Sequence, residues 1–156
     1  MIEMIKDAVI AKAFEHSHRQ YLVGDLRQAQ ELQHLHESNV EVGITEYKTF
    51  GWEKPHYHPI ACEYQMILEG VTKYIDISED IEIEMKKGDF FIIRPNTQYI
   101  QKSQPGCKIL FFKYPAGNDK KVLPLTDRMK EWISLWEKEW DTKKLKKIQN
   151  SPYLYP

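Results

Sequence analysis

A succession of short apolar segments, separated by turns that contain glycine or proline, fills residues 40–114 and constrains the fold most. Ile81, Ile83 and Met85 alternate with charged residues, which is typical of a strand with one buried face. The segment Phe90–Ile93 is apolar at every position, as in a strand that lies between two layers. Short strands at this spacing predict an all-β sandwich or a closed barrel.

Two of the predicted strands adjoin at a single glycine. The apolar segment Ala61–Glu69 ends at Gly70, and Val71–Ile77 follows at once. Glycine is the residue that most readily adopts the backbone angles of a tight turn. The sequence therefore predicts that these two segments pair with each other as a hairpin.

Residues 1–36 are expected to be an extension that packs on the barrel or reaches a second subunit. Tyr21, Leu22 and Val23 predict a short strand. The stretch Asp25–His36 has its apolar residues at helical spacing, and Asp25 is a suitable N-cap, so that a short amphipathic helix is predicted there. The apolar residues of this stretch are Leu26, Ala29, Leu32 and Leu35.

After a barrel expected to span residues 37–124, the pattern predicts a helix over 125–149, and residues 150–156 are a tail. Thr126 or Asp127 can cap the start of the helix. Apolar side chains recur three and four positions apart. They are Met129, Trp132, Ile133, Trp136 and Trp140. This stripe must be covered by the chain's own barrel or by a second subunit, and we expect a homodimer held partly by this helix or by the N-terminal segment.

The charge balance excludes some classes of partner. The chain carries 22 basic and 23 acidic side chains, a net charge of -1, so that no overall field attracts nucleic acid or an anionic membrane. No apolar run approaches the roughly 20 residues that span a bilayer. The first residues do not resemble a signal peptide, and Cys62 and Cys107 are too few for a disulfide framework. We therefore expect a cytoplasmic protein with a small-molecule partner.

Two histidines and a glutamate form the clearest chemical pattern. His56 and His58 are separated by one residue on a segment expected to be extended, so that their side chains point to the same face. Glu63 opens the next strand and can turn toward the same interior. Two imidazoles and a carboxylate that converge in this way suit a divalent metal such as iron, manganese, nickel or zinc.

These residues stand in an arrangement that resembles the first sequence motif of the cupin superfamily. In that motif a glycine leads to His-x-His, then to a glutamate and a closing glycine, and the matching positions are Gly51, His56, His58, Glu63 and Gly70. The stretch Gly88–Tyr99 resembles the second cupin motif. The resemblance implies a small single-domain cupin: a double-stranded β-helix, or jelly roll, with a short N-terminal helical segment and a C-terminal α-helix.

The sequence departs from the family at one position that matters for the metal. A histidine usually ends the second motif and completes the metal site, whereas Tyr99 stands there in this chain. In one interpretation His56, His58 and Glu63 hold the metal with water or Tyr99 added, because three protein ligands suffice for a catalytic metal. In the other the metal is lost, and the pocket uses a histidine as base and Tyr99 as acid.

Three hypotheses about function follow from the resemblance. The first is a metal-dependent enzyme that acts on a small polar or carbohydrate-like substrate. The second is a metal-free isomerase or epimerase of deoxy-ketosugars carried on nucleotides, in which His56, His58 and Tyr99 are the catalytic residues. The third is a module that binds or senses a small ligand without catalysis.

Three further residues are candidates for contact with the substrate. Gln65 lies two positions after Glu63, so strand alternation places the two side chains on the same face. Arg94 and Lys102 carry positive charges that can meet an anionic group on the ligand. The sequence thus predicts a pocket with a partly polar floor, which suits a small polar ligand.

Overall fold

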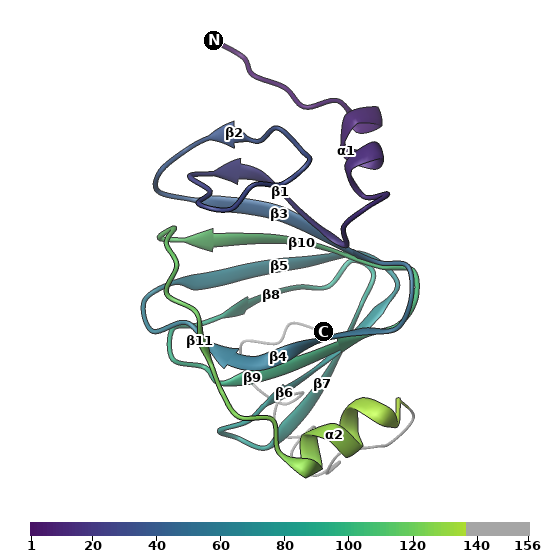
Figure 1. The fold of residues 1–156 in the computed structure, drawn as a ribbon. Coiled ribbons are helices and arrows are strands. Elements are labelled where there is room, and N and C mark those ends of the chain that lie inside the picture. Colours follow the sequence, from purple (N-terminus) through teal and green to yellow (C-terminus); the bar gives the residue numbers. More distant parts are fainter. Residues whose placement is uncertain (137–156) are drawn as a thin grey trace.

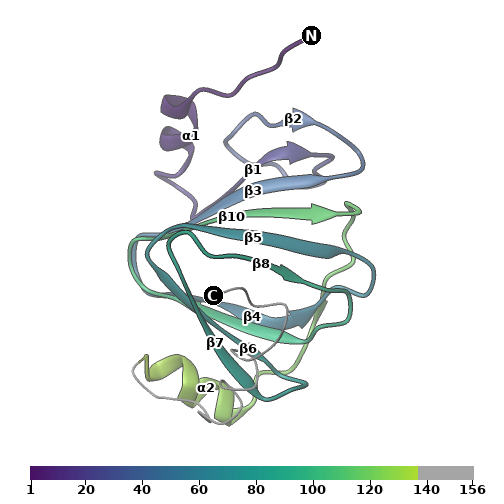
Figure 2. The same ribbon diagram turned by 180° about the vertical axis from the view of Figure 1, so that it is seen from behind.

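The computed structural model describes residues 1–136, which form two sheets that face each other around an interior, with a helix at either end of the barrel (Figures 1 and 2). The six-stranded sheet comprises, in spatial order, β2 (Leu35–His36), β1 (Arg19–Gly24), β3 (Glu41–Tyr47), β10 (Cys107–Tyr114), β5 (Cys62–Glu69) and β8 (Phe90–Ile93). The five-stranded sheet comprises β11 (Lys121–Val122), β4 (Gly51–Tyr57), β9 (Tyr99–Ser103), β6 (Val71–Asp76) and β7 (Ile81–Lys86). The helices are α1 (Asp7–Ala13) and α2 (Asp127–Ser134). Neither has the length and apolarity needed to cross a membrane.

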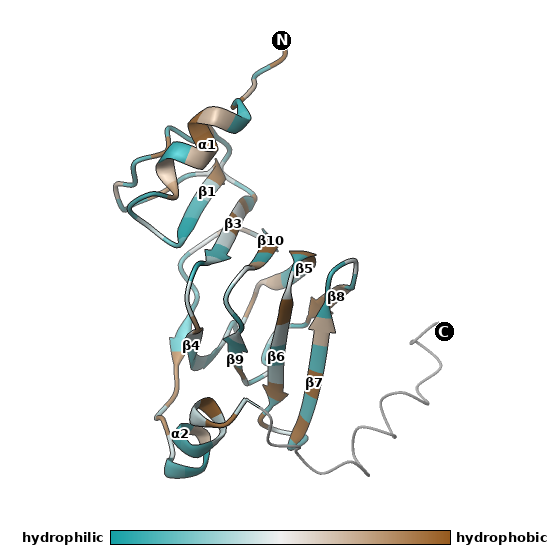
Figure 3. Cartoon of the chain, turned by 90° about the vertical axis from the view of Figure 1, so that its right-hand side faces the viewer, coloured by the Kyte–Doolittle hydropathy of each residue, from teal (hydrophilic) through white to brown (hydrophobic). Residues whose placement is uncertain are grey.

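The interior between the sheets is apolar at one end and polar at the other. The apolar cluster consists of Tyr47, Ile67, Cys107 and Ile109, against which Met85 and Phe91 pack. Inward and outward side chains alternate along the strands, as the bands of opposite hydropathy along β7 show (Figure 3). The apolar end joins the two sheets, and the polar end is free to form a pocket.

The predicted hairpin around Gly70 is wrong. β5 pairs with β10 and β8, whereas β6 pairs with β7 and β9, so that the chain passes from one sheet to the other at this glycine. Gly70 has a φ of 76°, and a Cβ there would lie 2.7 Å from the Cα of Cys107. Only glycine adopts this positive φ readily and has no Cβ to clash with Cys107. The glycine that predicted a hairpin turn therefore forms the turn by which the chain passes between the two sheets.

The helix predicted over Asp25–His36 is also wrong, because a side chain takes over the backbone hydrogen bonds of that region. Gln30 Oε1 accepts from the N–H of Tyr21 at 2.8 Å, and Gln30 Nε2 donates to the carbonyls of Tyr21 and Leu32 at 2.7 and 2.8 Å. Leu32 is fully buried at the same place. The N-terminal helix lies instead at α1, where Ala13 is buried.

The C-terminal helix begins where the sequence predicted. The hydroxyl of Thr126 accepts from the backbone N–H of the third residue after it at 3.3 Å, which is an N-cap hydrogen bond. The helix ends at Ser134, because Leu135 leaves the helical region with φ -123° and ψ 88°. Trp136 therefore follows the helix instead of lying on it, and Trp140 lies outside the described residues.

The apolar stripe of α2 is covered by the chain's own five-stranded sheet. Trp132 is fully buried in a cluster with Ile75 and Ile100, and its indole N–H donates to the carboxylate of Glu82. Lys102 reaches from β9 to the end of the helix, where its Nζ donates to the carbonyls of Trp132 and Leu135. A cation at these last carbonyls satisfies groups that the helix itself leaves without partners.

We expect Trp132→Ala to lower the free energy of unfolding by about 3–5 kcal/mol, because the change leaves a large cavity and removes the indole N–H that donates to Glu82, which then keeps only its ion pair with Lys73. Denaturant unfolding measures this loss. Leu135→Ala is the matched control, since its side chain is exposed on the same segment, and it should cost well under about 1 kcal/mol. Equal losses in the two variants would show that α2 is not anchored by the indole.

Candidate metal centre and its pocket

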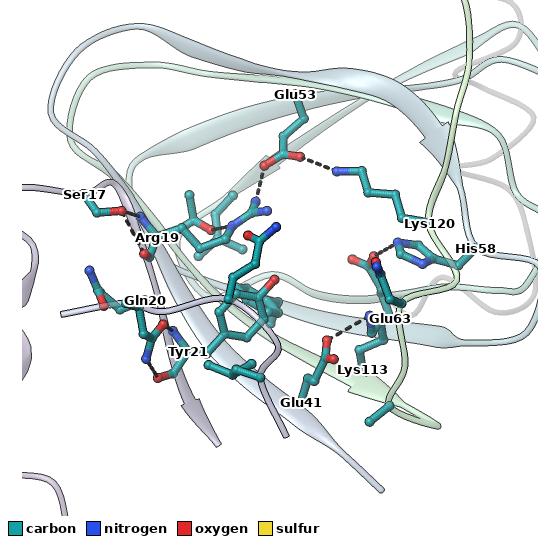
Figure 4. A pocket seen from close by; sticks show the side chains of 18 of the residues that line it. Ser17, Arg19, Gln20, Tyr21, Glu41, Glu53, His58, Glu63, Lys113 and Lys120 are labelled. Carbon is teal, nitrogen blue, oxygen red and sulfur yellow. Dashed lines mark hydrogen bonds and ion pairs between the residues drawn. The ribbon is translucent and has the colours of Figure 1, made fainter. Parts of the chain in front are cut away.

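A cavity of about 830 Å³ occupies the polar half of the barrel. Side chains from both sheets line it, and residues 25–31 and 116–118 complete its wall. The lining is largely polar or charged, as the close view of the pocket shows (Figure 4). A concave site with convergent polar groups is the arrangement in which small-molecule ligands bind.

His56, His58 and Glu63 meet in the wall of this cavity, as the sequence predicted. All three are buried, with exposed fractions of 2%, 7% and 9%, and their ligand atoms lie within 4.8 Å of one another. The register of β4 against β9 shifts between Glu53 and His56, where Pro55 cannot donate to a neighbouring strand. Such irregularities re-aim side chains and are frequent beside active sites.

His58 lies between two carboxylates. Its Nε2 is 2.7 Å from Oε1 of Glu63, and its Nδ1 is 2.7 Å from Oδ1 of Asp119. The other oxygen of Asp119 accepts from the backbone N–H groups of Ile60 and Ala61 at 3.1 and 3.0 Å. Burial alone would lower the pKa of His58, but the hydrogen bonds to Glu63 and Asp119 outweigh it and raise that pKa. Asp119 thus fixes the orientation of the ring.

The pKa of His56 is shifted in the opposite direction to that of His58. The Nδ1 of His56 donates to the carbonyl of Lys54 at 2.7 Å, which leaves the lone pair on Nε2. Burial, together with the positive charge of Lys120, lowers the pKa of His56 to about 4. A neutral imidazole with a fixed tautomer is the form that binds a metal or accepts a proton.

The carboxylate of Glu63 is surrounded by donors. Oε1 accepts from His58 and from the hydroxyl of Tyr99, at 3.3 Å for the latter. Oε2 accepts from Gln65 Nε2 at 2.9 Å, and Gln65 in turn accepts from the hydroxyl of Tyr74 at 2.6 Å. Burial alone would raise the pKa of Glu63, but the hydrogen bond and charge of His58, the hydrogen bond of Gln65 and the charge of His56 together outweigh it and lower that pKa to about 2. Glu63 is therefore ionised at neutral pH.

Tyr99 occupies the position where the family places a histidine. Its ring centroid lies 4.4 Å from that of His56, and burial raises the pKa of its hydroxyl well above the usual value, with the charge of Glu63 adding to the effect. The hydroxyl is consequently neutral and donates a hydrogen bond. A neutral phenol is a weak metal ligand, so the candidate ligand set for a metal consists of the two histidines and the glutamate.

The chemistry of this donor set fits a divalent transition metal. Two imidazole nitrogens and one carboxylate oxygen form a mixed set that accepts iron, manganese, nickel or zinc. His56 keeps Nε2 for the metal, and the Nδ1 of His58 is held by Asp119, which is the usual partner of a metal-binding histidine. A metal at the site would replace the contact between Nε2 of His58 and Glu63.

A second group of charges lines the pocket and is paired internally. Arg19 Nη2 forms an ion pair with Glu53, and Lys120 Nζ lies 3.2 Å from the other oxygen of the same carboxylate (Figure 4). Lys113 Nζ lies 2.8 Å from Glu41. Each of these three cations therefore has a carboxylate partner within the pocket.

The structure brings only one of the three predicted substrate contacts into the pocket. Gln65 lines it beside Glu63. Lys102 is fully buried on the other side of its sheet, where it binds the carbonyls at the end of α2, so that its predicted contact with substrate is wrong. Arg94 is exposed in the segment after β8 and does not line the cavity.

Six charged residues of the site were not predicted from the sequence: Arg19, Glu41, Glu53, Lys113, Asp119 and Lys120. Asp119 lies in the loop between β10 and β11, 61 positions after the histidine that it orients. Arg19 opens β1 of the six-stranded sheet, where the sequence predicted only a short strand over Tyr21, Leu22 and Val23. Glu53 did have a signal, because it precedes His56 on the same strand.

Comparison with solved structures places the fold. DMSP lyase DddQ from Ruegeria pomeroyi matches with a TM-score of 0.54 and 11% identity, over 72% of this chain and 54% of that chain. KdgF from Halomonas sp. matches with a TM-score of 0.50 and 14% identity, over 65% of this chain and 80% of that one. A Klebsiella pneumoniae protein with a double-stranded β-helix domain gives 0.48 and 17%, over 54% and 70%. No family model and no curated protein sequence matches. The predicted jelly-roll fold is confirmed.

We expect Asp119→Ala to weaken divalent metal binding about 10–100-fold, because His58 loses the carboxylate that fixes its ring and tautomer. Calorimetric titration of chelator-treated protein with zinc measures the change. Asp76→Ala is the matched control, since Asp76 also accepts backbone N–H groups in a turn but lies outside the pocket. An unchanged zinc affinity for Asp119→Ala would contradict the role given to this carboxylate.

Proposed function

Because the chain has the cupin-type double-stranded β-helix fold, we propose that it is an enzyme that uses a divalent metal to act on a small polar or carbohydrate-like substrate. The observation that carries the proposal is the convergence of His56, His58 and Glu63 in the wall of the pocket. Buried imidazoles and carboxylates stabilise a fold less well than apolar side chains of the same size would. Their presence in a pocket therefore indicates a functional site.

The residues around the ligand set support a catalytic site. His56, His58 and Glu63 would hold the metal, which leaves coordination positions for substrate or water. When bound there, a divalent metal supplies Lewis acidity toward an oxygen of the substrate or of water. Tyr99 presents a neutral hydroxyl beside Glu63, at 3.3 Å, and can donate a hydrogen bond or a proton to a substrate oxygen.

The lining of the pocket supports a substrate that is polar but not strongly charged. Of the four cations that line it, Arg19, Lys113 and Lys120 are ion-paired and Arg27 is exposed, so that a polyanionic ligand would have to break the buried pairs in order to bind near the metal ligands. Hydroxyl and amide groups can instead exchange hydrogen bonds with ligand hydroxyls; Gln101 and Tyr47 are joined at 3.0 Å in the same wall. This chemistry favours a small polyhydroxylated compound over a nucleoside diphosphate.

The comparisons support enzymatic function in general terms. DddQ is described as a DMSP lyase, and it shares the fold at a TM-score of 0.54. Proteins that share a fold can differ in reaction and substrate, so the proposal depends on the residues of the pocket in this chain.

A metal-free acid–base enzyme is the second candidate. The hydrogen-bonded series from Asp119 through His58 and Glu63 to Tyr99 favours it, because it links a histidine and a phenol through one carboxylate. His56, neutral at pH 7, would be the base, and Tyr99 the acid. The paired cations of the pocket count against a nucleotide-linked substrate for such an enzyme. If the protein binds a ligand but neither the metal-dependent nor the metal-free reaction is observed, it is a binding module without catalysis.

Purified protein is expected to bind about one divalent metal per chain, with the His56→Ala/His58→Ala variant binding less than about a tenth as much, because two of the three ligands are gone. Elemental analysis after dialysis measures both. Tyr57→Ala, between the two histidines, is the control for disturbing this segment without removing a ligand. A double variant that keeps full stoichiometric metal would place the ion elsewhere.

A second experiment distinguishes the metal-dependent enzyme from the metal-free enzyme by the effects of a chelator and of Tyr99→Phe. In the metal enzyme a chelator abolishes turnover, and Tyr99→Phe retains full metal content. In the metal-free enzyme a chelator changes nothing, and Tyr99→Phe lowers kcat by roughly 10²–10⁴-fold while KM stays nearly constant. Turnover of a panel of sugars, sugar acids and nucleotide sugars provides the measurement. Activity that survives chelation contradicts the main proposal.

A further inference from the structure

A tyrosine on the five-stranded sheet is linked to the candidate metal centre through a glutamine on the opposite sheet. Tyr74 belongs to β6, and its hydroxyl donates to Oε1 of Gln65 on β5 at 2.6 Å. Gln65 Nε2 in turn donates to Oε2 of Glu63 at 2.9 Å. Tyr74 and Gln65 are both buried. The three side chains thus form one hydrogen-bonded series that crosses the interior and ends at Glu63.

The two carboxylate oxygens of Glu63 have different surroundings. Oε1 lies 2.7 Å from Nε2 of His58 and accepts from the hydroxyl of Tyr99 at 3.3 Å. Oε2 is the oxygen that accepts from Gln65. The last torsion of a glutamate side chain has broad minima, so a carboxylate without such a partner could rotate. The hydrogen bond from Gln65 therefore determines which oxygen is presented to the histidines.

The orientation of the Gln65 amide matters because its two ends have opposite hydrogen-bonding roles. An ionised carboxylate has only acceptors, so the amide must turn its N–H group, and not its carbonyl, toward Glu63. The buried carbonyl of Gln65 then needs a donor from elsewhere. Tyr74 supplies it, since burial raises the pKa of its hydroxyl well above the usual value and the hydroxyl keeps its proton.

Aromatic neighbours hold the ring of Tyr74 in place. Its centroid lies 5.2 Å from that of Phe91, which packs against the apolar cluster, and 5.9 Å from that of Tyr99. Tyr74 therefore lies where the apolar end of the barrel meets the polar pocket. A ring fixed by packing gives its hydroxyl a defined position, which is what a group that orients another side chain requires.

We infer that Tyr74 is a positioning residue of this site: through Gln65 it holds Glu63 so that Oε1 faces His56 and His58. The inference rests on the proposed function, in which Glu63 is a ligand of the metal. Removal of a group that hydrogen-bonds a metal ligand typically lowers metal affinity about 10–100-fold. Tyr74 acts one hydrogen bond further from the ligand than Gln65 does, so that its removal should have the smaller effect.

Calorimetric titration of chelator-treated protein with zinc measures the effect. We expect Gln65→Met to weaken zinc binding at least about 10-fold, because methionine is of similar length but has no amide. Tyr74→Phe, which keeps the ring and removes the donor, should weaken zinc binding about 5-fold. The double variant should bind zinc no more weakly than Gln65→Met alone, because Tyr74 acts through the amide.

Tyr47→Phe is the matched control. The hydroxyl of Tyr47 also donates to a buried glutamine, Gln101, at 3.0 Å. Gln101 donates onward to Thr72 and Ser103 instead of to Glu63. The control therefore removes the same kind of hydrogen bond from the same barrel, and its zinc affinity should equal that of the wild type.

Nuclear magnetic resonance of the metal-free protein tests the positioning without zinc. The amide protons of the Gln65 side chain, assigned by their loss in Gln65→Met, should give two well-separated signals, because one proton is bonded to a carboxylate. The two signals should move together in Tyr74→Phe and stay in place in Tyr47→Phe. This pattern in a wild-type chain that binds no zinc would contradict the proposed metal function but support the positioning by Tyr74.

Three results would overturn the inference. The first is a pair of Gln65 signals that Tyr74→Phe leaves unchanged. The second is a loss of zinc affinity in the double variant that equals the sum of the two single losses in free energy, because the two residues then act separately. The third is an equal loss in Tyr74→Phe and Tyr47→Phe. If Gln65→Met does not fold, this last comparison decides the inference by itself.

Discussion

Glu63 is an ionised carboxylate inside the barrel, and the surrounding residues are arranged to satisfy its charge. Such a group is costly to bury unless it is paired and fully hydrogen-bonded. His58 supplies the ion pair, while Gln65 and Tyr99 donate to the remaining lone pairs. Asp119 extends the series to the loop between β10 and β11. This one requirement fixes the rotamers of the site before any ligand arrives, which is the preorganisation that a metal centre needs.

The division of the barrel interior explains how such a costly cluster is tolerated. The apolar cluster around Ile67 and Ile109 holds the sheets together at one end, and α2 adds a second apolar layer through Trp132. The polar end contributes little cohesion and is therefore free to hold a cavity of about 830 Å³. Arg19, Lys113 and Lys120 are paired with carboxylates inside it, so that these cations are already satisfied without a ligand. Both properties suit a ligand recognised by hydrogen bonds and a metal.

The sequence predicted the fold and the convergence of His56, His58 and Glu63 because both depend on local patterns. Strand alternation placed His56 and His58 on one face, and the order of turns indicated a barrel. The misses share a cause, since they depend on which distant segments meet. Gly70 has the signature of a hairpin but turns a corner between sheets, Gln30 replaces a helix by bonding to β1, and Lys102 faces α2 instead of the pocket. Asp119 had no local signal, because a loop residue gains its role only from the folded barrel.

The central claim is that His56, His58 and Glu63 bind one divalent metal. X-ray absorption spectroscopy of the zinc-loaded protein tests it most directly, because it reports the atoms around the ion. The account predicts two imidazole nitrogens and a carboxylate oxygen at about 2.0–2.2 Å, with the imidazole signal lost in His56→Ala/His58→Ala. A spectrum without imidazole scattering, or one that the double variant leaves unchanged, would contradict the account.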